Sequence, residues 1–368
     1  MSPVSIVPVN DLSRWSPVDL SEIAKRVDQV LRSGMYLNGP RVKELEARFG
    51  ESLGRRHVLA VASGTDALVI ALAALRIGAE QVVATVANAA GYATNAILRQ
   101  LATPLLVDVD PESGQMSPEL LTKAFREHKQ IRAVIVTHLY GLMTDISRIA
   151  QICRANGALL IEDCAQSFGA SSNGVPAGAW GDAAAFSLYP TKNLAALGDG
   201  GMVAFQDSEA FSRARKIAQY GWSSRYDVEL EGGINSRLDE MQAAVVLQRY
   251  GSVDSRNSRR LDILRRYAKS VSAPRRFIFE DSERCVAHLA VMQTPTRDRD
   301  RAAMNDSGID SAIHYPIPDH KQPAWRQYFK GVVLPNAEAH CAKVLTLPCF
   351  PELTEEEIVR VCKALQSL

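Results

Sequence analysis

The sequence predicts an α/β fold in which a mostly parallel, seven-stranded sheet is sandwiched by helices. Short apolar runs recur between residues 57 and 205, and helical stretches separate most of them. Strands that are apolar on both faces occur in sheets that helices cover on two sides. The length of 368 residues exceeds that of a typical single domain. We therefore expect a large domain over residues 1–250, including an N-terminal helical segment, and a smaller C-terminal α/β domain over residues 251–368.

The elements of the large domain can be assigned in order. Residues 18–50 have helical apolar spacing, with a break near residues 34–40, where two glycines and a proline interrupt the pattern. The apolar runs that follow predict the seven strands. These strands are expected at residues 57–62, 81–86, 104–109, 133–137, 158–162, 183–187 and 201–205.

The rest of the chain combines charged helix with a smaller α/β unit. Residues 208–270 are expected to be helical, and the arginines in their second half predict a long solvated face. Beyond them we expect a strand near residues 287–292, a loop rich in His and Pro at 314–323, and a closing helix over 354–365. Thr354 and Glu357 have the spacing of a capping box at the start of that helix.

Composition excludes several classes of function. The 42 basic and 41 acidic residues nearly cancel, so no overall field attracts nucleic acid or an anionic membrane. No apolar run is long enough to span a bilayer, and the start does not resemble a signal peptide, so we expect a cytoplasmic protein. None of the six cysteines forms a CxxC pair, so we expect free thiols and no metal site.

The first segment with chemical potential is Ser-Gly-Thr-Asp-Ala-Leu at residues 63–68. It follows an apolar strand and opens an Ala/Leu-rich helix. The N-terminus of a helix carries free N–H groups and partial positive charge, so it can bind a phosphate. Gly64 permits close approach of the backbone, and Thr65 adds a hydroxyl. Taken alone, the same segment is also typical of an ordinary helix cap.

Two further segments supply ionisable side chains. Asp163 ends an apolar strand, where open parallel sheets bind ligands, although an aspartate there is also a common helix cap. Lys192 lies between two apolar strands, near hydroxyls and glycines, although most lysines are simply solvated. Together the three segments match what pyridoxal 5′-phosphate (PLP) needs: a phosphate cradle, an acid for its ring nitrogen and a lysine for its aldehyde.

With these segments the sequence resembles the DegT/DnrJ/EryC1/StrS family of sugar aminotransferases, within PLP fold type I, the aspartate aminotransferase superfamily. The resemblance extends from about Gly34 to the C-terminus. The matching segments are residues 39–40, 63–68, 102–104, 107–110, 138–141, 161–166, 186–194, 233–238, 242–244, 314–316 and 347–348.

The resemblance implies a role for individual residues. Lys192 would be the Schiff-base lysine, Asp163 the partner of the ring nitrogen, and Gln166 a neighbour of the phenolic oxygen. The phosphate would be bound by Gly64, Thr65 and Ser187, and, across a homodimer interface, by Asn235 of the neighbouring subunit. Residues expected to face the substrate are Tyr36, His314, Tyr315 and His320. The two histidines fit a polar surface loop equally well.

One stretch departs from the family pattern. The family has an aromatic residue stacked on the PLP ring just after the third strand, and here residues 86–94 do not place one at the usual position. Either Tyr92 supplies this platform or a smaller residue such as Ala90 occupies it.

The resemblance also implies a reaction. An amino acid, expected to be L-glutamate, would convert PLP to pyridoxamine phosphate (PMP), which would then aminate a nucleotide-linked keto sugar. The product would serve polysaccharide, glycan or secreted-metabolite biosynthesis. Relatives that deoxygenate keto sugars carry histidine in place of Lys192, so the lysine favours transamination. An aminocyclitol aminotransferase, a sugar dehydratase on the same scaffold and a non-catalytic PLP-binding regulator are the alternatives. A generic nucleotide-binding oxidoreductase is disfavoured, because no GxGxxG follows the first strand.

Overall fold

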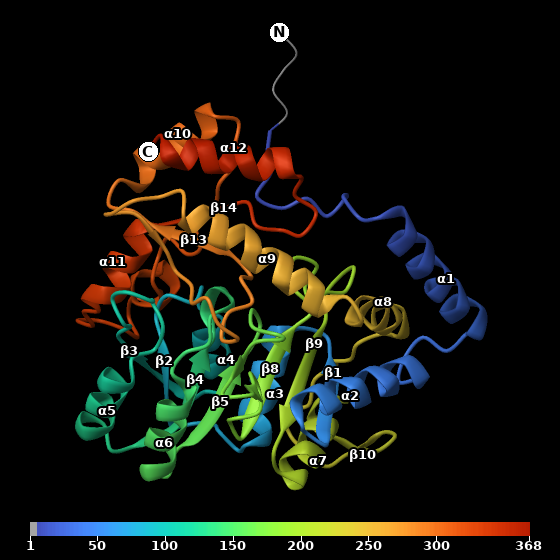
Figure 1. Cartoon of the computed structure of the whole chain (residues 1–368). Helices are drawn as coiled ribbons and strands as arrows, with labels where there is room; N and C mark the ends of the chain where they lie inside the picture. The colour runs from blue at the N-terminus through green and yellow to red at the C-terminus, as the bar shows by residue number, and fades with distance from the viewer. Residues whose placement is uncertain (1–5) are drawn as a thin grey trace.

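The computed structural model describes residues 6–368, and its centre is a seven-stranded sheet. The strand order is β1-β9-β8-β5-β4-β2-β3 (Figure 1). Only β9 runs antiparallel to its neighbours. The strands are β1 (His57–Val61), β2 (Val82–Val86), β3 (Thr103–Val107), β4 (Ile131–Thr137), β5 (Leu159–Asp163), β8 (Ala183–Ser187) and β9 (Gly201–Phe205). The predicted sheet and its seven strands are therefore confirmed.

Helices cover both faces of this sheet because side chains along each strand alternate between two cores. Val134 and Leu160 face one core, whereas Ile135 and Ile161 face the other. The first core is closed by α2 (Pro40–Leu53), α5 (Pro118–Glu127) and α6 (Ile146–Ala155). The second core is closed by α3 (Gly64–Ala74), α4 (Tyr92–Arg99) and α7 (Ser208–Ile217).

The N-terminal helical segment breaks where predicted. α1 (Pro17–Ser33) ends at Gly34, which adopts the left-handed conformation with φ 67°, and α2 begins at Pro40. Upstream of α1, Val7 pairs with Ile309, and Arg14 donates two hydrogen bonds to Glu357. The start of the described chain therefore packs against the C-terminal region (Figure 1). The domain boundary at residue 250 stays a prediction.

The C-terminal region contains a second, antiparallel sheet of order β12-β13-β14. The predicted strand near 287–292 corresponds to β13, and the closing helix begins with the expected Thr354–Glu357 capping box. The elements are α9 (Val253–Ala268), β12 (Arg276–Phe277), β13 (Ala290–Gln293), α10 (Arg297–Asp306), α11 (Pro335–Lys343), β14 (Val344–Leu347) and α12 (Glu355–Gln366).

Residues 208–270 differ from the expectation in two ways. Helices α7, α8 (Glu240–Tyr250) and α9 are interrupted by a small hairpin of β10 (Trp222–Ser224) and β11 (Asp227–Val228). The expected solvated face is also wrong at one position, because Arg260 of α9 is buried. Its guanidinium donates to the carbonyl oxygens of Cys349 and His288, which replaces the lost contact with water. A second small hairpin joins β6 (Ser171–Ser172) and β7 (Val175–Pro176).

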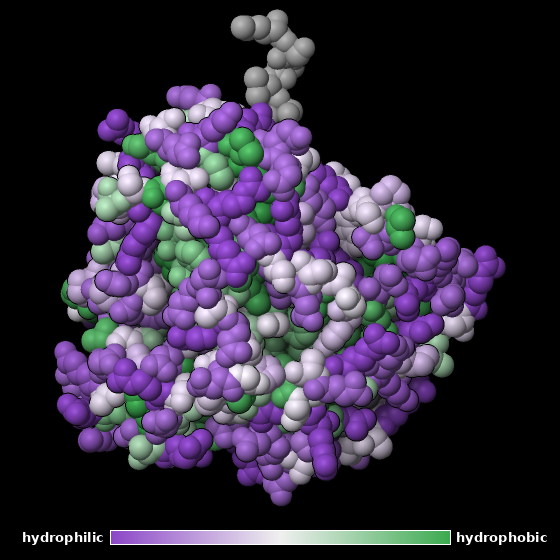
Figure 2. Space-filling view, in the orientation of Figure 1, coloured by the Kyte–Doolittle hydropathy of each residue, from purple (hydrophilic) through white to green (hydrophobic). Residues whose placement is uncertain are grey.

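Hydrophilic residues cover most of the face shown in Figure 2, and hydrophobic ones are scattered between them. No helix within residues 6–368 combines the length and the apolar character needed to cross a bilayer. All six cysteines are free thiols, as expected, and five of them are buried.

Candidate active site

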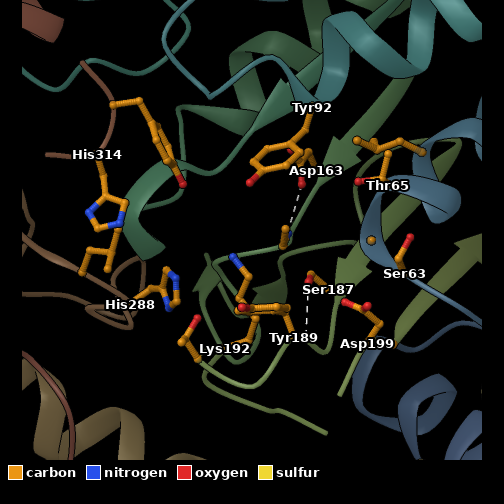
Figure 3. Close-up of a pocket in the computed structure, with 17 residues that line it drawn as sticks. Ser63, Thr65, Tyr92, Asp163, Ser187, Tyr189, Lys192, Asp199, His288 and His314 are labelled. Carbon is orange, nitrogen blue, oxygen red and sulfur yellow. Dashed lines mark hydrogen bonds between the residues drawn. The ribbon is translucent and has the colours of Figure 1, made fainter. Parts of the chain in front are cut away.

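A cavity of about 340 Å³ lies at the carboxyl ends of the parallel strands. Ser63 follows β1, Asp163 ends β5 and Ser187 ends β8, so the sheet topology itself brings these residues together. Figure 3 shows Ser63, Thr65 and Ser187 on one side and His288 and His314 on the other. The lining also contains Gly64, Leu68, Tyr92, Ala165, Tyr189, Thr191, Lys192, Asp199, Gly200, Leu289 and Tyr315.

The turn between β1 and α3 forms an anion cradle. The Ser63 hydroxyl caps α3 by accepting from the N–H of Asp66 at 3.1 Å, and within residues 6–368 no acceptor takes the N–H groups of Gly64 and Thr65, which can therefore bind a ligand. A Cβ on Gly64 would lie 2.8 Å from Cβ of Ser187, so only glycine lets the turn approach β8 this closely. The Thr65 hydroxyl lies beside this turn (Figure 3).

The Asp163 carboxylate is buried at the inner end of the cavity. It accepts from the Thr137 hydroxyl at 3.1 Å and from the N–H of Ala165 at 3.1 Å. Burial raises the pKa of Asp163, while the N–H of Ala165 and the charge of Lys192 oppose that rise. A buried carboxylate with few donors gains most from a cationic partner, such as a protonated ring nitrogen.

Lys192 lies in the irregular segment between β8 and β9. The backbone there is held by hydrogen bonds from the N–H of Lys192 to the carbonyl of Tyr189 and from the N–H of Leu188 to that of Gly200. Burial lowers the pKa of Lys192 to about 8, although the nearby Asp163 charge opposes the shift. A lysine with this pKa has a larger fraction of neutral, nucleophilic amine near neutral pH.

The loop that carries His314 and Tyr315 closes the opposite side of the cavity. The Tyr315 hydroxyl accepts from the Gln166 amide at 3.0 Å, and the Gln166 oxygen accepts from the N–H of Tyr140 at 2.6 Å. The Tyr140 hydroxyl in turn donates to the carbonyl of His314 at 2.6 Å. Gln166 does not line the cavity itself, but its hydrogen bond holds Tyr315, which does.

Three of the predicted site residues lie away from this cavity. Tyr36 is exposed, and its hydroxyl donates to the carbonyl of Leu31. Asn235 is exposed and accepts from Arg237. His320 is buried against α11, where its Nε2 lies 2.9 Å from the Glu338 carboxylate. Within this chain they do not meet the other predicted residues.

The structure also adds residues that the sequence did not single out. Asp199 comes from the glycine-rich stretch 198–201 after Lys192, which lies outside the segments that match the family. His288 belongs to a predicted strand, where a lone histidine gives no sign of facing a cavity. Tyr92 lines the cavity as the first residue of α4, whereas Ala90 is not among the lining residues.

One cluster near the site has the composition of a metal centre. The potential ligand atoms of His138, Glu162 and Cys164 lie within 4.8 Å of one another. However, the Glu162 carboxylate already accepts from the backbone N–H groups of Gly178, Trp180 and Gly181 and lies 3.1 Å from His138. This carboxylate is thus committed to a structural network that closes the 178–181 turn.

Comparison with known proteins gives consistent matches over the whole chain. Residues 17–366 match the model of the DegT/DnrJ/EryC1/StrS aminotransferase family. A Geobacillus stearothermophilus protein named pleiotropic regulatory protein is 36% identical, covering 95% of each chain. A Streptomyces venezuelae protein named dTDP-3-amino-3,4,6-trideoxy-alpha-D-glucose transaminase is 35% identical, covering 98% of this chain and 95% of that protein.

Further matches agree with these. An Acidithiobacillus ferrooxidans protein named UDP-N-acetyl-3-dehydro-alpha-D-glucosamine 3-aminotransferase is 35% identical, covering 100% of this chain and 99% of that protein. The crystal structure of S. venezuelae DesV in complex with a ketimine intermediate superposes with a TM-score of 0.94 at 34% identity, covering 99% of this chain and 98% of that one. NtdA from Bacillus subtilis with bound PMP superposes with a TM-score of 0.92 at 28% identity, covering 98% and 85%.

Proposed function

The chain belongs to the DegT/DnrJ/EryC1/StrS aminotransferase family, and from this premise we propose that it moves an amino group from L-glutamate to a nucleotide-linked keto sugar with PLP as cofactor. The observation that carries the proposal is the meeting of Lys192, Asp163 and the Gly64 cradle in one cavity. The relatives whose names mention UDP- and dTDP-linked sugars support a nucleotide-linked acceptor.

The residues present fit PLP at both ends of the cavity. Gly64, Thr65 and Ser187 would bind the phosphate at the start of α3, and Asp163 would hold the proton of the ring nitrogen. When bound, PLP supplies an electron sink for the carbon next to the reacting nitrogen. Lys192 would bind the cofactor aldehyde, and its Nζ, once free, would accept a proton and return it. Of the tyrosines that line the cavity, Tyr92 is the one that the family resemblance suggests for stacking on the ring.

The charges in the cavity support a homodimer with shared active sites. Among its lining residues, Lys192 is the one cation of lysine or arginine type, against the carboxylates of Asp163 and Asp199. A cofactor phosphate and a nucleotide diphosphate need more positive charge than this. Asn235 is exposed beside a second cavity of about 610 Å³, whose lining includes Arg215, Lys216, Arg225 and Arg237. We propose that a second copy of the chain presents this basic surface and Asn235 to the active site.

The name of the Geobacillus relative is a reason to keep a non-catalytic regulator as a second candidate. A regulator has no need for a lysine with a lowered pKa beside a buried carboxylate, and this chain retains both. An aminocyclitol aminotransferase would use the same residues with a different acceptor. The identity of the acceptor therefore needs a direct test.

The experiment separates the two half reactions. PLP-loaded protein is mixed with L-glutamate, and the change in the visible spectrum and the 2-oxoglutarate formed are measured. UDP- and dTDP-linked keto sugars and a keto cyclitol are then added, and the products are identified by mass. We expect one 2-oxoglutarate per site and amination of a nucleotide sugar. Lys192→Ala should abolish both, whereas Lys129→Ala, at an exposed lysine, should not. PLP binding without reaction with any amino donor would support the regulator instead.

A further inference from the structure

A row of hydrogen bonds runs from Arg276 on the surface to the backbone of His314 at the cavity wall. The Arg276 guanidinium donates to the Gln293 side-chain oxygen, from Nε at 3.1 Å and from Nη2 at 2.7 Å. The Gln293 amide nitrogen lies 3.2 Å from Nδ1 of His340, and Nε2 of His340 lies 3.0 Å from the Tyr140 hydroxyl. That hydroxyl donates to the carbonyl of His314 at 2.6 Å. These five residues form one relay, and its three middle members are buried.

The donors and acceptors of the relay can be assigned from its two ends. Arginine can only donate, so the Gln293 oxygen faces Arg276 and the NH2 group of Gln293 faces His340, whose Nδ1 must accept. At the other end the His314 carbonyl can only accept, so the Tyr140 proton points toward it. The Tyr140 oxygen is then left to accept from Nε2 of His340. Both ends therefore require the same form of His340, with the proton on Nε2 and a lone pair on Nδ1.

Burial keeps the relay in this form near neutral pH. It lowers the pKa of His340 to about 4, and the charge of Arg276 acts in the same direction, so the ring is neutral. Burial also raises the pKa of Tyr140 well above its ordinary value of 10, so the hydroxyl keeps its proton. The hydrogen bond from His340 to Tyr140 is thus a permanent feature of the folded protein at neutral pH.

Tyr140 is connected twice to the segment that forms the cavity wall. Its hydroxyl donates to the carbonyl of His314, and its N–H donates to the Gln166 oxygen, while the Gln166 amide donates to the Tyr315 hydroxyl. Tyr140 has φ 64°, a left-handed conformation that a residue with a side chain keeps only where its surroundings enforce it. Tyr140 therefore holds both residues of this wall, and its own orientation depends on its neighbours.

The His340 ring is fixed against Tyr140. The two rings are nearly parallel, with an interplanar angle of 13° and centroids 5.9 Å apart. Gly114 lies against the His340 ring, and any Cβ at this position would collide with it. The Gly114 carbonyl accepts from the buried Asn88 amide at 2.8 Å, which holds this glycine in place. The Nε2 donor of His340 therefore stays directed at the Tyr140 oxygen.

We propose that His340 is a positioning residue for the His314–Tyr315 wall of the active site, and that it acts through the Tyr140 hydroxyl. With the donor in place, Tyr140 keeps the orientation in which it binds the His314 carbonyl, and the two wall residues meet a substrate in one arrangement. Without the donor, the buried Tyr140 oxygen loses its partner and the wall loses a fixed support. The inference rests on the proposed transamination for the identity of the substrate.

Substitution of His340 tests the positioning role. His340→Leu has no donor, whereas His340→Gln offers one donor and one acceptor, as the neutral ring does. In single turnovers of PLP-loaded protein with L-glutamate, we expect His340→Leu to raise the half-saturating concentration by about 3- to 30-fold, with less change in the maximal rate. PLP affinity should stay close to that of the wild type, because the phosphate cradle lies on the other side of the cavity from His314 (Figure 3). We expect His340→Gln to recover most of the loss.

A double-mutant cycle tests whether His340 acts through Tyr140. Tyr140→Phe removes the hydroxyl and should raise the half-saturating concentration at least as much as His340→Leu does. Adding His340→Leu to Tyr140→Phe should change little further, because the link is already broken. Effects that multiply in the double variant would overturn the claim. Tyr267→Phe is the matched control, since this tyrosine is buried and its hydroxyl has no hydrogen-bond partner within residues 6–368.

The state of the wall can also be measured without cofactor or activity. Burial lowers the pKa of His314 below its usual value of 6.5, and the charge of Lys192 lowers it further. NMR titration of histidine-labelled, cofactor-free protein measures this pKa, with the signal assigned by its loss in His314→Gln. We expect Tyr140→Phe and His340→Leu to raise it toward 6.5, because a loosened wall exposes the ring to water. Tyr267→Phe should leave it unchanged. An unchanged pKa in both relay variants would overturn the positioning role.

The outcomes keep the two claims apart. If wild-type protein reacts and His340→Leu has the same half-saturating concentration, the positioning role is wrong. It is also wrong if His340→Gln is no better than His340→Leu, because the loss would then come from packing. If the wild-type protein itself gives no half reaction, the proposed transamination fails, and the titration of His314 alone decides whether the relay holds the wall.

Discussion

Lys192 and Asp163 lie in one buried site and affect each other's protonation. Burial alone would strongly favour neutral forms of both, and their mutual attraction opposes this. The result is a lysine that can be neutral near physiological pH and a carboxylate that gains from a cationic partner. These are the two properties that covalent capture of an aldehyde and protonation of a pyridine ring require.

The lowered pKa of Lys192 predicts how cofactor capture depends on pH. Only the neutral amine attacks an aldehyde, and the neutral fraction grows as pH rises through the pKa. The rate at which cofactor-free protein captures PLP should therefore increase with pH, with a midpoint near the lysine pKa of about 8. Stopped-flow absorbance measures this rate. A midpoint near 10.5, the ordinary lysine value, would show that burial does not act on Lys192 as described.

Substitution of Asp163 tests the acid assigned to the ring nitrogen. Asp163→Asn keeps the shape but removes the negative charge; its one oxygen can still accept from the N–H of Ala165, and its NH2 group can donate to the Thr137 hydroxyl oxygen. Without the charge the ring nitrogen loses its proton, so the half reaction with L-glutamate should slow by about 100- to 1,000-fold. Rapid-mixing spectroscopy of PLP-loaded protein measures it. A rate within a few-fold of the wild-type value would remove Asp163 from its assigned role.

At the scale of elements, sequence patterns predicted the parts built from long apolar runs. All seven strands of the large sheet are recovered because buried strands need continuous apolar residues. The short strands β12 and β14 and the hairpin at 222–228 were missed, because they are set by tertiary packing and by turn residues rather than by a sustained period. His288 was missed because the orientation of its ring depends on Asn193 and Asn257, which come from distant segments of the sequence.

Substitution of Gly64 tests the packing of the turn between β1 and α3. In Gly64→Ala the new methyl group would lie 2.8 Å from Cβ of Ser187, so the turn must move away from β8. We expect a loss of about 1–3 kcal/mol in the free energy of unfolding. PLP affinity should fall as well, because the cradle itself moves. Denaturant unfolding and PLP titration measure the two effects.

Gly251→Ala is the matched control for this substitution. Gly251 has right-handed helical angles, and a Cβ there meets nothing within 4 Å. This variant should keep both the stability and the PLP affinity of the wild-type protein. If Gly64→Ala behaved in the same way, close packing of the turn against β8 would not be needed for the cradle.

At the scale of the whole molecule, the cavity that we propose for the cofactor contains one lysine and no arginine among its lining residues. The second cavity, with its basic lining residues, and Asn235 both lie away from the cofactor cavity. The proposed dimer therefore brings together surfaces that one chain keeps apart. In a C2 dimer, each copy gives the other the same surface that it receives. The resemblance implied this arrangement from the sequence, whereas spacing along the chain could not have indicated it.

Mixing two variants that each damage one part of the proposed site tests whether the site is shared. Lys192→Ala damages the cavity of its own chain, and Asn235→Ala damages what that chain contributes to its partner. A hybrid dimer would contain one fully intact site, so unfolding and refolding the two variants together should recover part of the wild-type transaminase activity. Activity assays of the mixture and of each variant alone measure this. No recovery, in mixtures shown by mass spectrometry to contain hybrids, would contradict a shared site.

The role proposed for Lys192 is tested most directly by locating the covalent bond between the protein and the cofactor. PLP-loaded protein is reduced with borohydride and digested, and the modified peptide is identified by mass spectrometry. We predict that the visible absorption band disappears and that the label is found on Lys192 alone. A label on a different lysine, or full turnover by Lys192→Ala, would show that Lys192 is not the lysine that binds the cofactor.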